Sequence, residues 1–255
     1  MKNLLYILFV LPLLYSCQKY NKAPFDEKEK AIRNFPESMD VLVLDSLWEK
    51  RDSLSYLRLV NVRNILIKNS NNIPSWISNF DKFEMLTSDN LAKNKIDSIP
   101  NSIGNAKKLK QITLSYNKIK NLPSPFFRLV SLTYLNLDNN NIVSLSNDII
   151  NLKKLKSLHL SNNPLISLPD NICMVSSLKS IVIENTKITE LPKCLGNMQN
   201  LDWINLSGTQ LTEFPIEILD APKLETIHAK RLKLKNYQEV KAICEKRNIT
   251  FYYDE

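Results

Sequence analysis

The sequence predicts an α/β solenoid, a curved stack in which each turn of chain buries its apolar side against the next turn. The first observation is a 23-residue interval between leucines, at Leu86, Leu109, Leu132, Leu155, Leu178, Leu201 and Leu224. The second is a proline that recurs with the same repeat, at Pro100, Pro123, Pro169, Pro192 and Pro215. Recurrent proline excludes a series of long helices, because proline breaks a helix in its interior.

Each turn begins with a segment in which apolar residues alternate with other residues. After Leu155 come Leu158 and Leu160, which predict a short strand with these side chains inward. The next apolar residues, Leu165, Leu168 and Ile172, are more widely spaced, which suits a 3-10 or short helical return. We therefore expect one strand and one return segment in every turn.

An asparagine follows each of four expected strands. Its side chain can bond neighbouring backbone groups and it tolerates left-handed backbone angles, so it suits a tight turn. Thr186 and Thr209 take this place in the next two turns, where a hydroxyl can do part of the same work. The asparagines are Asn94, Asn117, Asn140 and Asn163.

The pattern LxxLxLxxNxIxxLPxxIxxL resembles the leucine-rich repeat family, in its 23-residue bacterial form with Leu-Pro in the second half. The resemblance implies a horseshoe with short parallel strands on the concave face, a convex side of 3-10, irregular or short helical segments, and a cap at each end. In that family the concave strand surface is usually the ligand face. We expect the repeats to span residues 62–235.

The N-terminal turns depart from the pattern. Asp89 falls at an offset from Leu86 where an apolar residue is expected, so we expect a distorted strand there. Pro74 and Pro100 are 26 residues apart, which places about three extra residues between two turns. Residues 37–61 are partly apolar but out of register, and we interpret them as an N-terminal cap.

The C-terminal residues 236–255 are interpreted as the second cap. Tyr237, Val240 and Cys244 have helical spacing, and the run from Ile249 to Tyr253 has the composition of a strand.

The N-terminus predicts export. Lys2 precedes an apolar run at residues 4–15, which is too short to span a bilayer and fits the core of a secretory signal in residues 1–16. Leu14, Tyr15, Ser16 and Cys17 resemble the bacterial lipobox, which implies cleavage before Cys17 and lipidation of Cys17, with residues 17–36 as lipidated cysteine and tether. The alternative is an ordinary signal peptide with a chance cysteine.

By the same resemblance, Gln18 after the cysteine disfavours retention in the inner membrane. We therefore expect a lipid anchor in the bacterial cell envelope, at the outer membrane. The side of that membrane which the protein faces is left open.

The chain carries a formal net charge of +8. Lysines cluster where a turn enters its strand, at Lys107, Lys108 and Lys110 and again at Lys153, Lys154 and Lys156. The favoured interpretation is a solvated edge, and the alternative is attraction to anionic lipid, acidic polysaccharide or an acidic protein. The export signal argues against nucleic acid as a partner.

Cys173 and Cys194 lie at similar offsets in adjacent turns. Export permits a disulfide between them. Both a disulfide and separate semi-buried thiols are compatible with the sequence.

No catalytic motif is present. The chain has no Gly-rich phosphate loop, no HExxH and no GxSxG. His159 and His228 lie three turns apart, roughly 14–15 Å, which is too far for one metal or one catalytic pair. Asp138, His159 and Glu184 come from three successive turns and could converge on a cation, but the imidazole has a different offset and would lie off the line of the carboxylates. We expect no enzyme activity, no cofactor and no metal.

Residues between the buried leucines are expected to point outward from the concave face, where the fold does not need them. Aromatic side chains among them are candidate anchors, since aromatic residues dominate many interfaces. We expect a monomer that binds a protein partner, with a carbohydrate or cell-surface polymer, or a structural envelope role, as the alternatives. The candidate binding residues are Tyr116, Tyr134, Asn136, Asp138, His159, Glu184, Trp203, Asn205 and His228.

Overall fold

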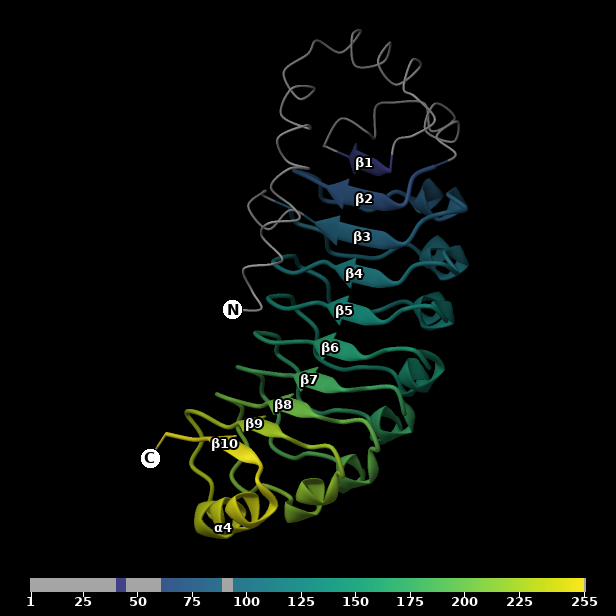
Figure 1. Ribbon diagram of the computed structural model, residues 1–255. Helices are drawn as coiled ribbons and strands as arrows, with labels where there is room; N and C mark the ends of the chain where they lie inside the picture. Colours follow the sequence, from purple (N-terminus) through teal and green to yellow (C-terminus); the bar gives the residue numbers. More distant parts are fainter. Residues whose placement is uncertain (1–39, 45–60, 89–93, 255) are drawn as a thin grey trace, which may run out of the picture.

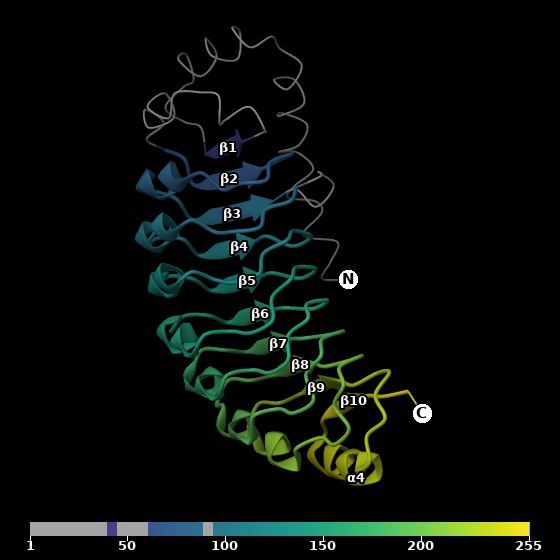
Figure 2. The same ribbon diagram turned by 180° about the vertical axis from the view of Figure 1, so that it is seen from behind.

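The computed structural model describes residues 40–44, 61–88 and 94–254. In these ranges the strands form one parallel sheet, and each strand pairs with the strand that follows it in the chain, from β1 to β10. The strands stack along one side of a bent column and the 3-10 segments along another (Figures 1 and 2). This is the expected leucine-rich repeat horseshoe, with the sheet as its concave strand face.

The strands have the following bounds: β1 Val41–Leu44, β2 Asn64–Ile67, β3 Met85–Ser88, β4 Gln111–Thr113, β5 Tyr134–Asn136, β6 Ser157–His159, β7 Ser180–Val182, β8 Trp203–Asn205, β9 Thr226–His228 and β10 Thr250–Tyr252. The 3-10 segments are η2 Ser75–Asn79, η3 Asn101–Asn105, η4 Ser124–Arg128, η5 Asn147–Asn151, η6 Asp170–Met174, η7 Lys193–Asn197 and η8 Ile216–Asp220. The helix α4 is Tyr237–Arg247.

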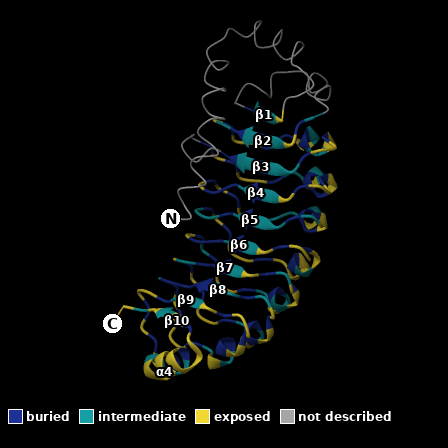
Figure 3. Ribbon diagram, viewed as in Figure 1, coloured by how far each residue is buried: buried dark blue, intermediate teal, exposed yellow. Residues whose placement is uncertain are grey.

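The core is a continuous file of apolar side chains inside the coil. Leu114, Leu137, Leu160 and Ile183 occupy equivalent places in four successive turns, and each is fully buried. Burial runs through the centre of every turn, and exposed residues lie on the 3-10 segments and α4 (Figure 3). The predicted inward file is therefore confirmed.

The return segments begin where the recurring prolines predict. Pro100, Pro123 and Pro169 directly precede η3, η4 and η6, each with extended backbone angles. Proline suits this place because its fixed φ leads into a helical turn and it has no N–H to leave unbonded. Before η5, Ser146 replaces proline, and its hydroxyl accepts a hydrogen bond from the Asp148 N–H at 3.1 Å.

One position in each 3-10 segment faces the following turn. A Cβ added to Gly104 would collide with the Pro125 carbonyl, and one added to Gly196 would collide with the Glu217 carbonyl. Glycine therefore lets η3 approach η4, and η7 approach η8, backbone to backbone. The equivalent residue of η6 is Cys173.

Cys173 forms a disulfide with Cys194 of the following turn, with 5.9 Å between the Cα atoms. Of the two arrangements that the sequence allowed, the structure therefore has the disulfide. Cys244 is a buried free thiol.

In the turn after a strand, one residue has left-handed backbone angles and the next residue is buried. A left-handed backbone occurs at Tyr116, Asn139, Asn162, Asn185, Gly208 and Arg231, which are 23 residues apart. The expectation that Asn117, Asn140 and Asn163 take these angles was wrong by one position. These asparagines are buried one residue later and serve as hydrogen-bonding groups.

Asn163 illustrates the hydrogen-bonding role. Its Oδ1 accepts from the Ile142 N–H at 2.9 Å, and its Nδ2 donates to the Leu137 carbonyl at 2.9 Å and the Leu160 carbonyl at 3.0 Å. One side chain thus joins two turns. Thr186 donates to the Ile183 carbonyl within its own turn, as expected of a partial replacement.

The register of the first 23-residue interval was wrong. Leu86 pairs with Ile112 in the sheet, so it is an inward strand residue and not the counterpart of Leu109. Phe83, which is buried, takes the place of Leu109. The extra residues therefore follow β3, between Ser88 and Asn94, and Asp89 lies outside the described residues.

Both ends continue the sheet. Within the expected N-terminal cap, Val41–Leu44 forms β1, in parallel register with β2. At the C-terminus, α4 buries Val240 and Cys244, and β10 pairs with β9, as the helical and strand patterns predicted. In the described ranges no helix is long and apolar enough to cross a bilayer.

Candidate binding site on the strand face

The strands from β5 to β9 bring most of the candidate residues onto one face. Tyr134 and Asn136 lie on β5, His159 on β6, and all three are partly exposed beside the buried Leu135 and Leu158. Tyr116 lies in the turn after β4, with 59% of its surface exposed, so it belongs to the edge of this face.

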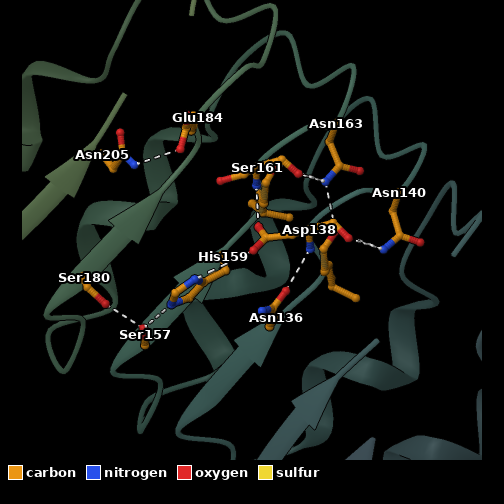
Figure 4. A network of polar contacts seen from close by, with 12 residues as sticks. Asn136, Asp138, Asn140, Ser157, His159, Ser161, Asn163, Ser180, Glu184 and Asn205 are labelled. Atoms are coloured by element: carbon orange, nitrogen blue, oxygen red, sulfur yellow. Dashed lines mark hydrogen bonds and ion pairs between the residues drawn. The ribbon is translucent and has the colours of Figure 1, made fainter. Parts of the chain in front are cut away.

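A chain of polar contacts runs across β6 and β7 (Figure 4). The Ser157 hydroxyl lies 2.9 Å from His159 Nε2 and 2.6 Å from the Ser180 hydroxyl. The Tyr134 ring packs against the imidazole, with 5.2 Å between ring centroids. His159 therefore contacts Tyr134 of β5 and Ser157 of its own strand, and Ser157 links it to Ser180 of β7.

Asp138 is held by hydrogen bonds to both its carboxylate and its backbone. Its Oδ1 accepts from the Ser161 N–H at 2.6 Å, and its own N–H donates to Asn136 Oδ1 at 2.9 Å. Its Oδ2 lies 4.0 Å from His159 Nδ1.

Burial decides the charge of both groups. It raises the pKa of Asp138 to about 6 and lowers the pKa of His159 to about 4. At a pH where the Asp138 carboxylate is charged, the His159 imidazole is therefore neutral. The two groups do not form an ion pair, although Oδ2 and Nδ1 are only 4.0 Å apart.

A second polar group lies nearer the C-terminus. Glu184 accepts from Asn205 Nδ2 at 3.2 Å and pairs with Arg231 at 2.5 Å. The arginine crosses the intervening turn at Gly208, where the glycine has a φ of +67° and an added Cβ would meet Asn185 Oδ1. Glycine here gives the left-handed backbone and leaves the space that Arg231 crosses.

Three aromatic rings gather at the C-terminal end of the strand face. The Trp203 and His228 rings are 5.9 Å apart edge to face, and the His228 and Tyr252 rings are 4.5 Å apart. Tyr252 is 45% exposed. We call Trp203, His228 and Tyr252 the aromatic cluster.

A hollow of about 460 Å³ adjoins the aromatic cluster at Trp203. We call it the strand hollow. Its charged lining comes from the residue just before the strand in four successive turns: Lys156, Lys179, Asp202 and Glu225. Two cations are therefore followed by two carboxylates along the stack, with the Trp203 ring beside them. Such a site offers apolar contact together with ionic contacts of both signs.

Of these residues the sequence pattern had indicated only Lys156, within a lysine cluster, and not Lys179, Asp202, Glu225 or Tyr252. The four charged residues share one offset, immediately before each strand, and the 23-residue repeat could have exposed the column. Tyr252 could not be placed, because its contact with His228 depends on how β10 pairs with β9.

Some residues expected to be outward are buried. Asn205 is 9% exposed, and its Oδ1 accepts from the Ser207 N–H at 3.1 Å. Ser115, Ser161 and Ser207, which directly follow the inward residues Leu114, Leu160 and Leu206, are also buried. Asn205 therefore positions Glu184 and the turn, and offers little surface to a partner.

The cation site considered for Asp138, His159 and Glu184 is not formed. Across the described ranges no group of three His, Cys, Asp or Glu side chains is arranged to hold a metal ion. Glu184 is instead turned to Asn205 and Arg231.

A family model described as leucine rich repeat matches residues 84–142, 107–165 and 153–211, which together span about half of the chain. The chain belongs to the leucine-rich repeat family. A comparison with curated proteins gave no match.

Solved structures share the fold. A leucine-rich repeat protein of Leptospira interrogans has a TM-score of 0.62 at 21% identity, over 91% of this chain and 70% of that one. An internalin, InlF, of Listeria monocytogenes has a TM-score of 0.63 at 19% identity, over 80% of this chain and 66% of that one.

The leucine-rich repeat ectodomain of the Arabidopsis thaliana receptor kinase GASSHO1/SCHENGEN3 has a TM-score of 0.64 at 26% identity. The match covers 78% of this chain and 25% of that one, whose structure was solved in complex with Casparian strip integrity factor 2. Leucine-rich repeat proteins generally act in protein–protein interaction, and the domain is typically a non-catalytic binding module.

Proposed function

We propose that the chain is a lipid-anchored recognition module of the bacterial cell envelope that binds a protein partner through the strand face. The observation that carries the proposal is the aromatic cluster beside the strand hollow. Trp203 and Tyr252 are partly exposed, although the solenoid needs only the inward side chains for its core. Aromatic groups are enriched at the centres of protein interfaces, and polar groups surround them at the rim.

The partner segment would lie across β6 to β9, along the axis of the stack. Lys156 and Lys179 would meet acidic groups, and Glu225 would meet a basic group, with an apolar side chain against Trp203. A related fold supports the proposal only at the level of the family, because the receptor ectodomain was solved in complex with Casparian strip integrity factor 2.

The test is affinity capture with the full chain, followed by mass spectrometry. A variant with Trp203→Ala and Tyr252→Ala should lose at least tenfold in affinity for the captured protein, since each replacement removes a large contact surface. Met174→Ala is the matched control, because Met174 is 65% exposed on η6, away from the strand face.

Equal capture by the wild type and the double variant would exclude the aromatic cluster as the interface. A glycan array with the same three proteins tests the alternative of a carbohydrate ligand. Binding to a glycan that the double variant loses would assign the strand face to carbohydrate.

The proposed anchor is a lipid on Cys17. It is supported by the lipobox-like residues 14–17 and by the disulfide between Cys173 and Cys194, which fits an oxidising compartment. Metabolic labelling with a fatty-acid analogue should mark the wild type and the control Cys244→Ser, and should not mark Cys17→Ser. Labelling of Cys17→Ser would contradict the proposal.

A further inference from the structure

A second hollow lies on the flank of the solenoid, between η4 and η5. Its volume is about 710 Å³, and none of the residues that line it belongs to a strand. We call it the flank hollow. It shares no lining residue with the strand hollow, so it is separate from the proposed partner-binding surface.

Phe127 lines the flank hollow. This residue occupies in η4 the position that Gly104 occupies in η3 and Gly196 in η7. Glycine lets the following turn approach closely, whereas Phe127 places a large ring there, which packs on Phe126. The segments η4 and η5 approach one another less closely than η3 and η4 or η7 and η8.

Cations dominate the lining. They are Lys107, Arg128, Lys153 and Lys154, against the carboxylate of Asp148. Lys107 donates to the Arg128 carbonyl at 3.1 Å, and the Asp148 carboxylate accepts from the Ser146 hydroxyl at 3.1 Å. Among the described residues none of the four cations forms an ion pair. Their mutual repulsion would be relieved by a bound anion.

The lining also offers apolar surface. Val130 is 52% exposed beside the cations, and Phe127 forms part of the wall. A small inorganic anion would use only the charged rim of a hollow this large. A ligand with a phosphate and an attached apolar part would use both components.

We propose that the flank hollow binds the headgroup of an anionic phospholipid. The phosphate would lie among Arg128, Lys153 and Lys154, and the glycerol and first acyl carbons would lie against Val130. This proposal does not depend on the strand face. It would place the flank of the solenoid against a membrane and leave the strand face open to a partner.

The test is a calorimetric titration of the full chain with Cys17→Ser, which removes the acceptor of the proposed anchor. The probes are dihexanoyl phosphatidylglycerol below its micelle concentration, dihexanoyl phosphatidylcholine and inorganic phosphate. We expect phosphatidylglycerol to bind at least tenfold more tightly than either of the others. Lys153→Gln with Lys154→Gln should weaken its binding at least tenfold.

The matched control is Lys233→Gln with Lys235→Gln, which removes the same charge from exposed positions outside the flank hollow. It should bind phosphatidylglycerol as the parent does. Asp148→Asn should strengthen binding several-fold, because it removes the carboxylate from the lining and leaves the backbone unchanged.

Equal affinity for the two lipids, or equal losses in the two lysine double variants, would overturn the proposal. Phosphate bound as tightly as phosphatidylglycerol would overturn the lipid assignment and leave a site for free phosphate. Weaker or unchanged binding by Asp148→Asn would show that the charge of the flank hollow does not govern the affinity.

Discussion

At the scale of the residue, the stack is joined by polar side chains that lie inside an apolar coil. Asn140 and Asn163 accept a backbone N–H from the preceding turn and donate to carbonyls of two turns. A buried side-chain amide is tolerated only when its N–H and C=O groups are hydrogen-bonded. The amides of Asn140 and Asn163 meet this condition by bonding backbone groups in and beside the turn that follows each strand.

Asn163→Ala should therefore be costly. It leaves the buried Ile142 N–H without its acceptor and removes bonds to two carbonyls, so we expect a loss of about 2–4 kcal/mol in the free energy of unfolding. Thr186→Ala removes one bond within a single turn and should lose about 1 kcal/mol. Urea unfolding of both variants measures the difference. Equal losses would show that the bonds between turns add nothing.

The pair of Asp138 and His159 makes opposing contributions to stability as the pH changes. Burial raises the pKa of Asp138 from 3.8 to about 6, so the folded state favours the protonated carboxyl. The resulting stabilisation is fully present below pH 3.8 and is lost as the pH rises from 3.8 to about 6. Burial lowers the pKa of His159 to about 4, so stability is lost as the pH falls from about 6.5 to 4. The two effects nearly cancel in this window.

Single substitutions should separate the two effects. As the pH falls from 6.5 to 4.5, the free energy of unfolding of Asp138→Asn should decrease relative to that of the wild type, and that of His159→Gln should increase. Each change should be on the order of 1–2 kcal/mol after allowance for partial exposure. Urea unfolding at the two pH values measures both. If the two variants follow the wild type at both values, these groups do not have the shifted pKa values.

At the scale of the element, the fourth residue of four 3-10 segments lies where one turn meets the next. Gly104 and Gly196 permit close approach, Phe127 lines the flank hollow, and Cys173 makes a covalent bond to the next turn. The same position of the repeat therefore serves close packing, a hollow or a cross-link according to the residue that occupies it.

Removal of the disulfide should lower stability by about 3 kcal/mol, because the bond constrains a loop of about 20 residues in the unfolded chain. The variant is Cys173→Ser with Cys194→Ser, measured by thermal unfolding beside the wild type with and without a reductant. The reduced wild type should match the double variant. A wild type unaffected by reductant, and equal to the variant, would show that the bond is absent in solution.

At the scale of the whole molecule, stability comes from the stacking of turns around one continuous core. A single turn buries too little apolar surface to offset the ordering of its chain, and several stacked turns succeed together. Damage to one central turn should therefore weaken its neighbours on both sides.

Leu158→Asp tests this dependence. It places a carboxylate at the fully buried position of β6, and we expect a loss of more than 4 kcal/mol or failure to fold. Ser157→Asp adds the same charge on the same strand but on the half-buried strand face, where it disturbs two hydrogen bonds of the hydroxyl, and should cost no more than about 2 kcal/mol. Circular dichroism and thermal unfolding measure both. Similar melting temperatures for the two variants would contradict the register of the sheet.

Much of the fold could be predicted from the sequence because the repeat is local. The inward file through Leu160, the return after Pro169 and the terminal helix with its strand each depend on the spacing of nearby residues. The register predicted for Leu86 was wrong, because a chance 23-residue interval misplaced the extra residues, which follow β3. The prediction was also wrong for Asn205, whose exposure depends on the turns beside it.

The sequence by itself determined the coiled architecture, the side of each strand that meets the core, and the columns from which a partner surface can be built. Only the tertiary structure decided which columns remain open, that Cys173 reaches Cys194, and that the aromatic cluster and the two hollows form. The physical reason is that repeat spacing is encoded within a turn. Exposure, side-chain contacts and gaps between turns depend instead on side chains from neighbouring turns, which can be about 20 or more residues away.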